Sequence, residues 1–170
     1  MNEILLVPHP ILRQNSKALN SVTKEDINLS KKMIKIMKKA PGVGLAANQI
    51  GTLKQIITVH IQDKENEIEK TFALFNPIII HYSKETIILE EGCLSLPKQF
   101  ANIERPKSII VRYMNEGNHI IEEKKEGLEA RILQHEIDHL SGKLFVDYLS
   151  PLKRSILIKK VKKLKKIGEI

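Results

Sequence analysis

The sequence predicts an α+β fold, a compact single domain in which helices and strands are segregated along the chain. Helical and strand-like segments follow one another in the order helix, several strands, helix, helix, which favours antiparallel or mixed sheets over an alternating parallel sheet. The chain has 170 residues, of which 42% are hydrophobic. A chain of this length buries about 70% of the surface that its unfolded form exposes, so one core needs no disulfide.

The first, N-terminal helix is predicted over residues 24–39. Thr23 and Asp26 have the spacing of an N-terminal capping box, and the apolar residues that follow recur with the period of a helix. Pro41 and Gly42 then end the pattern.

Five segments between this helix and residue 126 are predicted to be strands. They are rich in β-branched and aromatic residues, and charged or turn-prone stretches separate them. The segments are residues 54–60, 72–75, 78–90, 108–114 and 119–124.

Two more helices are expected after the strands. Residues 127–140 contain no proline, carry apolar residues on one side and stop before Ser141 and Gly142, as suits a buried central helix. Residues 151–170 alternate apolar residues with lysines at helical spacing, which indicates a basic amphipathic C-terminal helix.

The net charge of +8 is concentrated at the C-terminal end. Residues 151–170 hold eight basic side chains against one acidic, whereas residues 1–150 hold twenty against nineteen. A nearly neutral body argues against an RNA-binding domain, and 4% aromatic residues with no tryptophan offer no base-stacking platform. We therefore expect no sequence-specific nucleic-acid binding by the body.

The absence of a membrane span and of a secretory signal predicts a cytoplasmic protein. No apolar run approaches the roughly 20 residues of a membrane span, and the N-terminus lacks the pattern of a secretory signal. Cys93 is the single cysteine, so an internal disulfide is excluded. Its thiol is a small buried hydrophobe, a metal ligand or a nucleophile.

The central helix carries the pattern H-E-x-x-H at residues 135–139. His135 and His139 lie one turn apart on one helix face, where they can share a metal, and Glu136 can reach a metal-bound water. The alternative is two histidines and two acids on an ordinary helix surface. Apolar neighbours favour the metal, since charged groups in an apolar setting are costly unless paired or metal-bound.

A catalytic metal usually has three protein ligands, so a third ligand is required. Phe145 stands where a metzincin would have its third histidine, which argues against a zincin-type metallopeptidase. Cys93 is the best remaining candidate, because it follows a glycine at the end of a β-rich run.

Three motifs together identify a family. They are G-V-G-L-A-A-N-Q at residues 42–49, E-G-C-L-S at 91–95 and Q-H-E-I-D-H-L at 134–140. With these motifs intact and in order, the sequence resembles the peptide deformylases, which remove the N-formyl group from the formylmethionine of nascent polypeptides. The resemblance covers essentially the whole chain.

The resemblance implies a ligand set of Cys93, His135 and His139 around one divalent metal. The family metal is usually Fe2+, with Zn2+, Ni2+ or Co2+ able to occupy the site, whereas one thiolate and two imidazoles alone would suggest Zn2+. The implied fold is a compact α+β domain whose sheets surround the metal helix.

The resemblance also implies the mechanism. A metal-bound hydroxide attacks the formyl carbon while Glu136 takes a proton and later delivers it to the departing amine, releasing formate. Gln49 and the backbone N–H of Leu94 hold the formyl oxygen, on which negative charge develops.

The substrate methionine requires an apolar pocket, for which the resemblance implies Val43, Gly44, Leu128 and Ile132. Helix residues at this spacing are core in most proteins, and that interpretation stays open. Phe100 and Lys98 depart from the family pattern. Many bacterial relatives have, at the position of Phe100, an arginine that contacts the substrate backbone, and glycine is frequent at the position of Lys98.

Glu91 and Arg105 match family positions and are expected to pair and brace the second motif. The alternative is an ordinary surface ion pair.

By the same resemblance, residues 1–150 are the catalytic domain and residues 151–170 a basic helix appended to it. Some bacterial members dock on the ribosome near the tunnel exit through such a helix, and we expect the same partner here, with no membrane. A basic ribosome- or RNA-binding module with a vestigial metal site, and a zincin-type metallopeptidase, are the alternative functions.

Overall fold

The computed structural model describes residues 4–63 and 67–170. In chain order its elements are η1 (Pro10–Arg13), α1 (Lys24–Lys39), β1 (Gly44–Ala46), η2 (Ala47–Ile50), β2 (Ile56–Asp63), β3 (Ile68–Tyr82), β4 (Thr86–Cys93), β5 (Leu96–Pro106), β6 (Ser108–Met114), β7 (Ile120–Glu126), α2 (Gly127–Leu140), η3 (Phe145–Tyr148) and α3 (Pro151–Lys166), where η marks a 3-10 helix.

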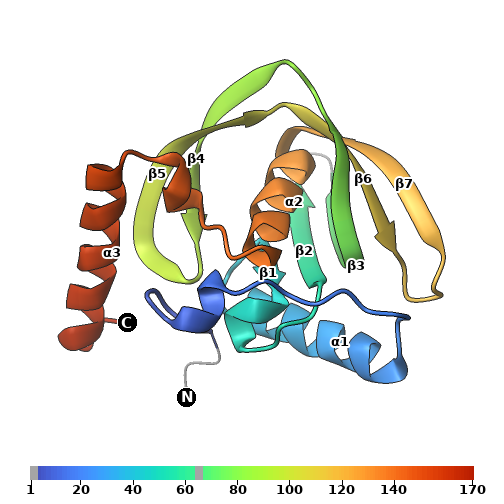
Figure 1. The fold of residues 1–170 in the computed structure, drawn as a ribbon, viewed down its shortest axis with the longest axis horizontal. Coiled ribbons are helices and arrows are strands. Elements are labelled where there is room, and N and C mark those ends of the chain that lie inside the picture. The colour runs from blue at the N-terminus through green and yellow to red at the C-terminus, as the bar shows by residue number, and fades with distance from the viewer. Residues whose placement is uncertain (1–3, 64–66) are drawn as a thin grey trace.

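The strands form two antiparallel sheets with α2 between them. The larger sheet has the order β1-β2-β3-β6-β7, and β4 pairs with β5 in a separate hairpin. Figure 1 shows α2 in the middle of the molecule, with the β4–β5 hairpin on one side and the larger sheet on the other. The predicted α+β fold around a central helix is confirmed.

The bounds predicted for the first helix coincide with those of α1. Thr23 and Asp26 form the capping box, in which the Asp26 carboxylate accepts from the Thr23 backbone N–H at 3.0 Å and the Thr23 hydroxyl accepts from the Asp26 backbone N–H at 3.3 Å. Asp26 also pairs with Lys54 at 2.6 Å. Met33 and Met37 lie on the same face of α1 as the buried Asp26, further along the helix, and are fully buried against the larger sheet.

The central helix α2 also has its predicted bounds. Its Ala130 and Leu133 are fully buried against Val59 and Val111 of the larger sheet. Because the β4–β5 hairpin covers the other side, most of the polar residues of α2 are buried as well, namely Arg131, Gln134, His135, Glu136 and His139. Such groups need partners inside the protein, and these partners define the site described below.

The strand predictions were correct in part. The segment 78–90 contains two strands, since β3 ends at Tyr82 and β4 begins at Thr86. The intervening turn is fixed by Ser83, whose hydroxyl donates to the Glu85 carbonyl at 2.9 Å and accepts from the Ser108 N–H at 3.0 Å. Strands β1 and β5 were not predicted.

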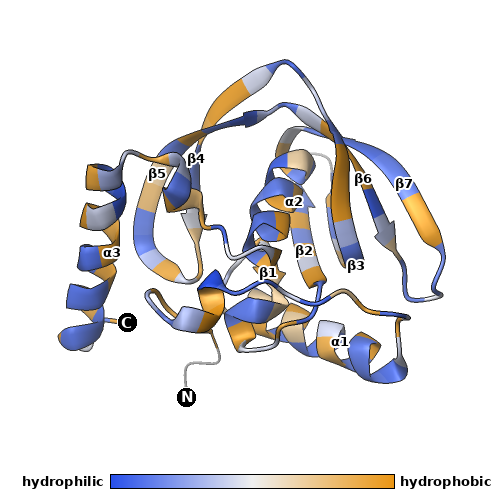
Figure 2. Cartoon of the chain, viewed as in Figure 1, coloured by the Kyte–Doolittle hydropathy of each residue, from blue (hydrophilic) through white to orange (hydrophobic). Residues whose placement is uncertain are grey.

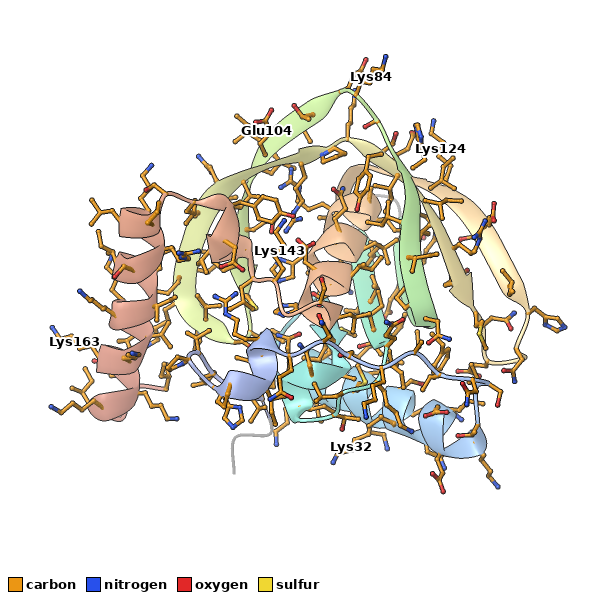
Figure 3. All side chains as sticks on the ribbon, viewed as in Figure 1. Lys32, Lys84, Glu104, Lys124, Lys143 and Lys163 are labelled. Atoms are coloured by element: carbon orange, nitrogen blue, oxygen red, sulfur yellow. The ribbon has the colours of Figure 1, made fainter. Side chains whose placement is uncertain are left out.

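The C-terminal helix α3 ends at Lys166, four residues before the end of the sequence, and Gly168 follows with φ +74°. Val161 is fully buried in a cluster with β5 and η3 residues, so α3 packs on the same body. The lysines of α3 are exposed. Figure 2 shows that much of this helix is hydrophilic, and Figure 3 shows Lys163 pointing away from the body of the protein. Within the described part of the chain, no helix is both long and apolar enough to cross a bilayer.

Candidate active site

The three sequence motifs meet at one cavity of about 480 Å³. One wall comes from the segment before and within β1 and from η2, the second from the end of β4 and the start of β5, and the third from α2. The cavity is lined by most of the predicted site residues: Val43, Gly44, Gln49, Glu91, Cys93, Leu94, Leu128, Ile132, His135 and Glu136. Segments separated by up to a hundred residues in sequence therefore form one site.

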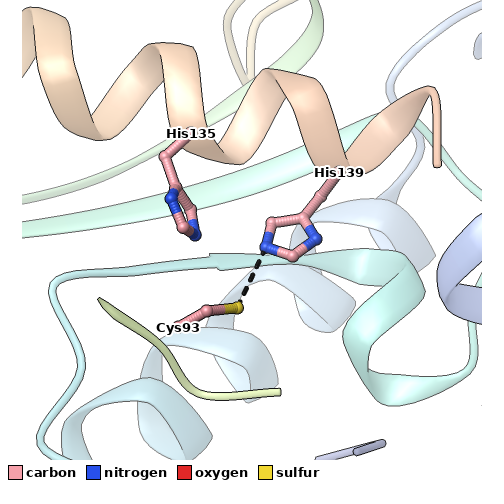
Figure 4. Close-up of side chains that lie close together, drawn as sticks. All are labelled: Cys93, His135 and His139. Atoms are coloured by element: carbon pink, nitrogen blue, oxygen red, sulfur yellow. Dashed lines mark hydrogen bonds between the residues drawn. The ribbon is translucent and has the colours of Figure 1, made fainter. Parts of the chain in front are cut away.

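The three predicted metal ligands lie together. One ligand atom from each of Cys93, His135 and His139 falls within 4.8 Å of the others. Figure 4 shows the thiol facing the two imidazoles, with Cys93 Sγ at 3.4 Å from His139 Nε2. The histidines lie one turn apart on α2, and Cys93 is placed opposite them by a register shift at the end of β4.

This cluster fits a divalent metal. His135 donates from Nδ1 to the Glu91 carboxylate at 2.9 Å, which leaves its Nε2 for a ligand. His139 is fully buried, and its Nε2 lies next to the thiol. One sulfur and two nitrogens form the three-ligand set of a catalytic site with an open position.

Phe145 occupies the position behind His135. Its ring centroid is 6.2 Å from that of His135 and the two planes differ by 23°, so the rings stack. The residue is buried in the core, where it supports the imidazole and supplies no ligand. The metzincin ligand set is therefore absent from this site.

Glu136 is buried beside the ligand cluster. Its Oε2 has no hydrogen-bond partner among the residues described, and its carboxylate fills the space that a side chain at Gly44 would take. Burial raises the pKa of Glu136 to about 7, and the opposing effect of the His135 charge is smaller. A carboxyl group with such a pKa can both accept and donate a proton near neutral pH.

Gln49 places an amide next to the ligand cluster. Its Oε1 accepts from the Ala46 N–H at 2.9 Å, which fixes the side chain, and its Nε2 donates to Ser95 Oγ at 3.1 Å. The same nitrogen lies 3.6 Å from Cys93 Sγ. Leu94 follows Cys93 in the cavity wall. Its side chain packs against Gly42 and fills the space that a side chain at position 42 would take.

The three large apolar residues predicted for the substrate pocket all line the cavity, two of them exposed and one buried. Val43 and Leu128 are 52% and 56% exposed although they are large and apolar, so they belong to the cavity surface and not to the core. Ile132 is 4% exposed and serves both the cavity and the core.

The two departures from the family pattern lie at the cavity rim. Phe100 is 60% exposed, and its ring lies against Gly92, its partner across the hairpin. Lys98 has φ +60° and lies 3.4 Å from the Glu169 carboxylate.

Glu91 and Arg105 form a buried ion pair. The guanidinium donates to both carboxylate oxygens, at 2.5 and 3.0 Å, and the two side chains are 5% and 2% exposed. The alternative of a surface ion pair is therefore wrong. Although burial favours the neutral acid, hydrogen bonds from His135 and Arg105 lower the pKa of Glu91 to about 2.

Sequence reasoning missed several residues that support the ligands. Arg131 donates to Glu91 at 2.7 Å, and Arg105 donates to Asp138 at 2.9 Å. Asn48 donates to the carbonyl of His139 at 2.6 Å. No local pattern in the sequence marked Arg131, because its burial and its partners depend on the hairpin that covers α2.

An H-E-x-x-H helix, a thiol close to both of its histidines and a buried carboxylate beside an open cavity are the features of a metal-dependent hydrolase. Comparison with known proteins supports this class and narrows it. The family model described as polypeptide deformylase matches residues 1–155. The chain belongs to the polypeptide deformylase family, and its activity is the hydrolytic removal of the N-formyl group from nascent polypeptides.

Individual relatives agree over nearly the whole chain. Peptide deformylase of Rhodopseudomonas palustris (strain TIE-1) is 44% identical over 169 residues, covering 99% of this chain and 97% of the relative. That of Phenylobacterium zucineum (strain HLK1) is 45% identical, with 96% of each covered. A crystal structure of the Ehrlichia chaffeensis enzyme has a TM-score of 0.93 at 35% identity, covering 99% and 98% of the two chains. Another from that organism, in complex with actinonin, has a TM-score of 0.89 at 38% identity and 95% coverage of both.

Proposed function

We propose that Cys93, His135 and His139 hold the catalytic metal and that Glu136 is the general base and acid of deformylation. The observation that carries this proposal is the buried carboxylate of Glu136, without a hydrogen-bond partner in the described chain, beside three ligand atoms within 4.8 Å of one another. A bound divalent metal supplies a water molecule that loses its proton near neutral pH.

Each protein group then has one task. Glu136 takes the proton from the attacking water and returns it to the departing amine, which its pKa of about 7 allows. The Gln49 amide and the backbone N–H of Leu94 donate to the formyl oxygen as negative charge develops on it. Donors of this kind contribute about 2.7 to 4 kcal/mol each to the transition state.

The methionine side chain of the substrate occupies the apolar wall formed by Val43, Gly44, Leu128 and Ile132. Half-exposed large apolar side chains on a cavity surface are the feature that supports this assignment. The cavity therefore suits N-formylmethionyl peptides as substrates.

For the metal itself we propose Fe2+, with Zn2+, Ni2+ or Co2+ as occupants of the purified protein. The thiolate and two imidazoles suit several of these ions, and the preference for iron rests on family membership. Metal analysis of protein purified without oxygen identifies the ion.

For the organisation of the chain we propose a catalytic domain of residues 1–150 with the basic helix of residues 151–170 appended to it. The buried Val161 supports packing of this helix on the catalytic body. The ribosome near the tunnel exit is the proposed partner of its outer face, which places the enzyme in the cytoplasm with nascent chains. Replacing the six lysines at positions 159, 160, 162, 163, 165 and 166 by glutamine should weaken ribosome binding, more strongly at low salt, because phosphate contacts are salt-dependent.

The activity test follows formate release from formyl-Met-Ala-Ser by metal-loaded protein. Glu136→Gln should retain the metal and lose turnover, whereas Cys93→Ala should lose the metal. Normal turnover by the first variant, or stoichiometric metal in the second, contradicts the assigned role.

A further inference from the structure

Arg131 is a buried arginine of α2 that has no task in the proposed function. Its side chain is 7% exposed. The guanidinium donates three hydrogen bonds: to Glu91 Oε1 at 2.7 Å, to the carbonyl of Ile103 at 2.9 Å and to that of Ile87 at 2.6 Å. Ile87 lies on β4 and Ile103 on β5, so this side chain fastens the metal helix to both strands of the hairpin that carries Cys93.

The position of Arg131 on the helix determines what it reaches. It lies one turn before His135, so the two side chains project from the same face toward one carboxylate. Glu91 Oε1 accepts from Arg131 and from Arg105 Nε, whereas Oε2 accepts from Arg105 Nη2 and His135 Nδ1. Four donors occupy the four acceptor positions of an ionised carboxylate. The carboxylate is thereby fixed with Oε2 toward the imidazole.

Charge balance also requires Arg131. Arg105 is shared between two carboxylates, since it donates to Glu91 and, at 2.9 Å, to Asp138. One guanidinium carries a single charge for two carboxylates, of which Glu91 is 5% and Asp138 21% exposed, and an uncompensated charge at a buried site such as Glu91 is strongly destabilising. Arg131 supplies the second cation, so that two carboxylates face two guanidiniums.

We infer that Arg131 is a positioning residue that acts through Glu91 to hold the His135 imidazole in its ligating orientation. This inference rests on the proposed function, in which His135 is a metal ligand. Partners that orient a ligating histidine typically change metal affinity or activity by about 10- to 100-fold when removed. Arg131 also lines the cavity, but its three hydrogen bonds all go to the β4–β5 hairpin, so we expect its loss to change metal release and kcat and to leave KM unchanged.

The experiment compares wild type with Arg131→Met, Arg131→Lys and the control Arg112→Met, all loaded with Co2+. Arg112 forms an exposed ion pair with Glu122 at 2.6 Å on the larger sheet. The decrease of the thiolate–Co2+ absorption measures the rate at which Co2+ is released to a chelator. The constants kcat and KM are measured on formyl-Met-Ala-Ser. Arg131→Met should release the ion about 10- to 100-fold faster and lower kcat with KM unchanged. Arg131→Lys keeps the charge and should recover part of this loss, and Arg112→Met should match wild type.

The same substitution in a Glu91→Gln background shows whether Arg131 acts through Glu91. Release rates should then change little on adding Arg131→Met, because the group that it positions is already altered. Three results would each overturn the inference. They are additive effects of the two substitutions, a raised KM with normal Co2+ release, and a lower melting temperature with normal release and normal kcat. If Arg131→Met does not fold, the test rests on Arg131→Lys. Normal Co2+ release and normal kcat in that variant would then refute the inference. A wild-type chain without thiolate–Co2+ absorption instead refutes the proposed metal site.

Discussion

Gly44→Ala should reduce turnover while leaving the fold and the metal in place. Gly44 lies in β1 directly over the carboxyl group of Glu136. A methyl group at this position would lie 2.7 Å from both Cδ and Cγ of Glu136, whereas ordinary contact begins at 3.4 Å. Cδ and Cγ must therefore move by about 0.7 Å, the difference between 3.4 and 2.7 Å, and Oε1, which lies closer still, by more; the side chain is buried, with 4% exposure.

The size of the effect follows from that displacement. A misplacement of about 1 Å can cost a reaction about 100-fold, so we expect kcat to fall by between about 10-fold and 100-fold. Overpacking of a buried site costs about 1 to 3 kcal/mol of folding stability, which the protein can tolerate. Metal content should not change, because Gly44 contacts the base and not the three ligands.

The assay measures formate release and metal content in Gly44→Ala and in the control Gly117→Ala. A Cβ at Gly117 would approach the exposed imidazole of His119 at 3.0 Å, which can move away, and would meet Asn115 Oδ1 at an ordinary contact distance of 3.4 Å. Wild-type turnover in Gly44→Ala would show that Glu136 relaxes without loss of function, and would refute the steric argument.

Three further predictions concern the capping box, the apolar wall and the metal. Burial raises the pKa of Asp26, but hydrogen bonds from Lys54 and Thr23 outweigh this effect, so the pKa is lowered in the folded protein. The stability that the Asp26 carboxylate contributes is therefore present above about pH 4 and is lost as the pH falls through the native pKa. Asp26→Asn should cost about 1 kcal/mol at neutral pH and flatten the acid side of a urea-unfolding series, and an unchanged pH dependence would contradict this. Leu128→Ala should lower kcat/KM for formyl-Met peptides about fivefold, for about 1 kcal/mol of lost contact, whereas Leu152→Ala on α3 should not; equal effects would remove Leu128 from the pocket. Chelation of the metal should lower the melting temperature and abolish formate release, with recovery of both on reloading, because an ion that binds only the native state stabilises it; a melting temperature unaffected by metal would contradict native-state binding.

Local signals predicted the helices well. The capping box at Thr23 and Asp26 and the break at Pro41 define α1, and the proline-free stretch before Ser141 defines α2. The ligand motif was readable for the same reason, since i, i+4 spacing fixes two histidines on one face. Each of these features depends on residues close together in sequence.

Features that depend on pairing between distant segments were not predictable. Strand β5 begins with Leu96-Pro97 and ends at Pro106, so its sequence reads as loop, yet it pairs along β4. Arg131 looks like a surface residue until the β4–β5 hairpin covers it and supplies Glu91. The partner that gives such a residue its role lies about 40 positions away and leaves no local pattern.

The proposed metal ligands come from two separate elements, the central helix and the β4–β5 hairpin, and this affects folding. Two ligands belong to α2, but Cys93 belongs to the hairpin and lies 46 positions before His139. An ion held by both therefore acts as a removable cross-link that closes a long loop. By the chain-entropy relation for disulfides, a covalent link over such a loop would contribute about 4 kcal/mol. The three proposed ligand atoms come together only where the hairpin docks on α2, so a chain with an undocked hairpin would also lack a complete set of ligands.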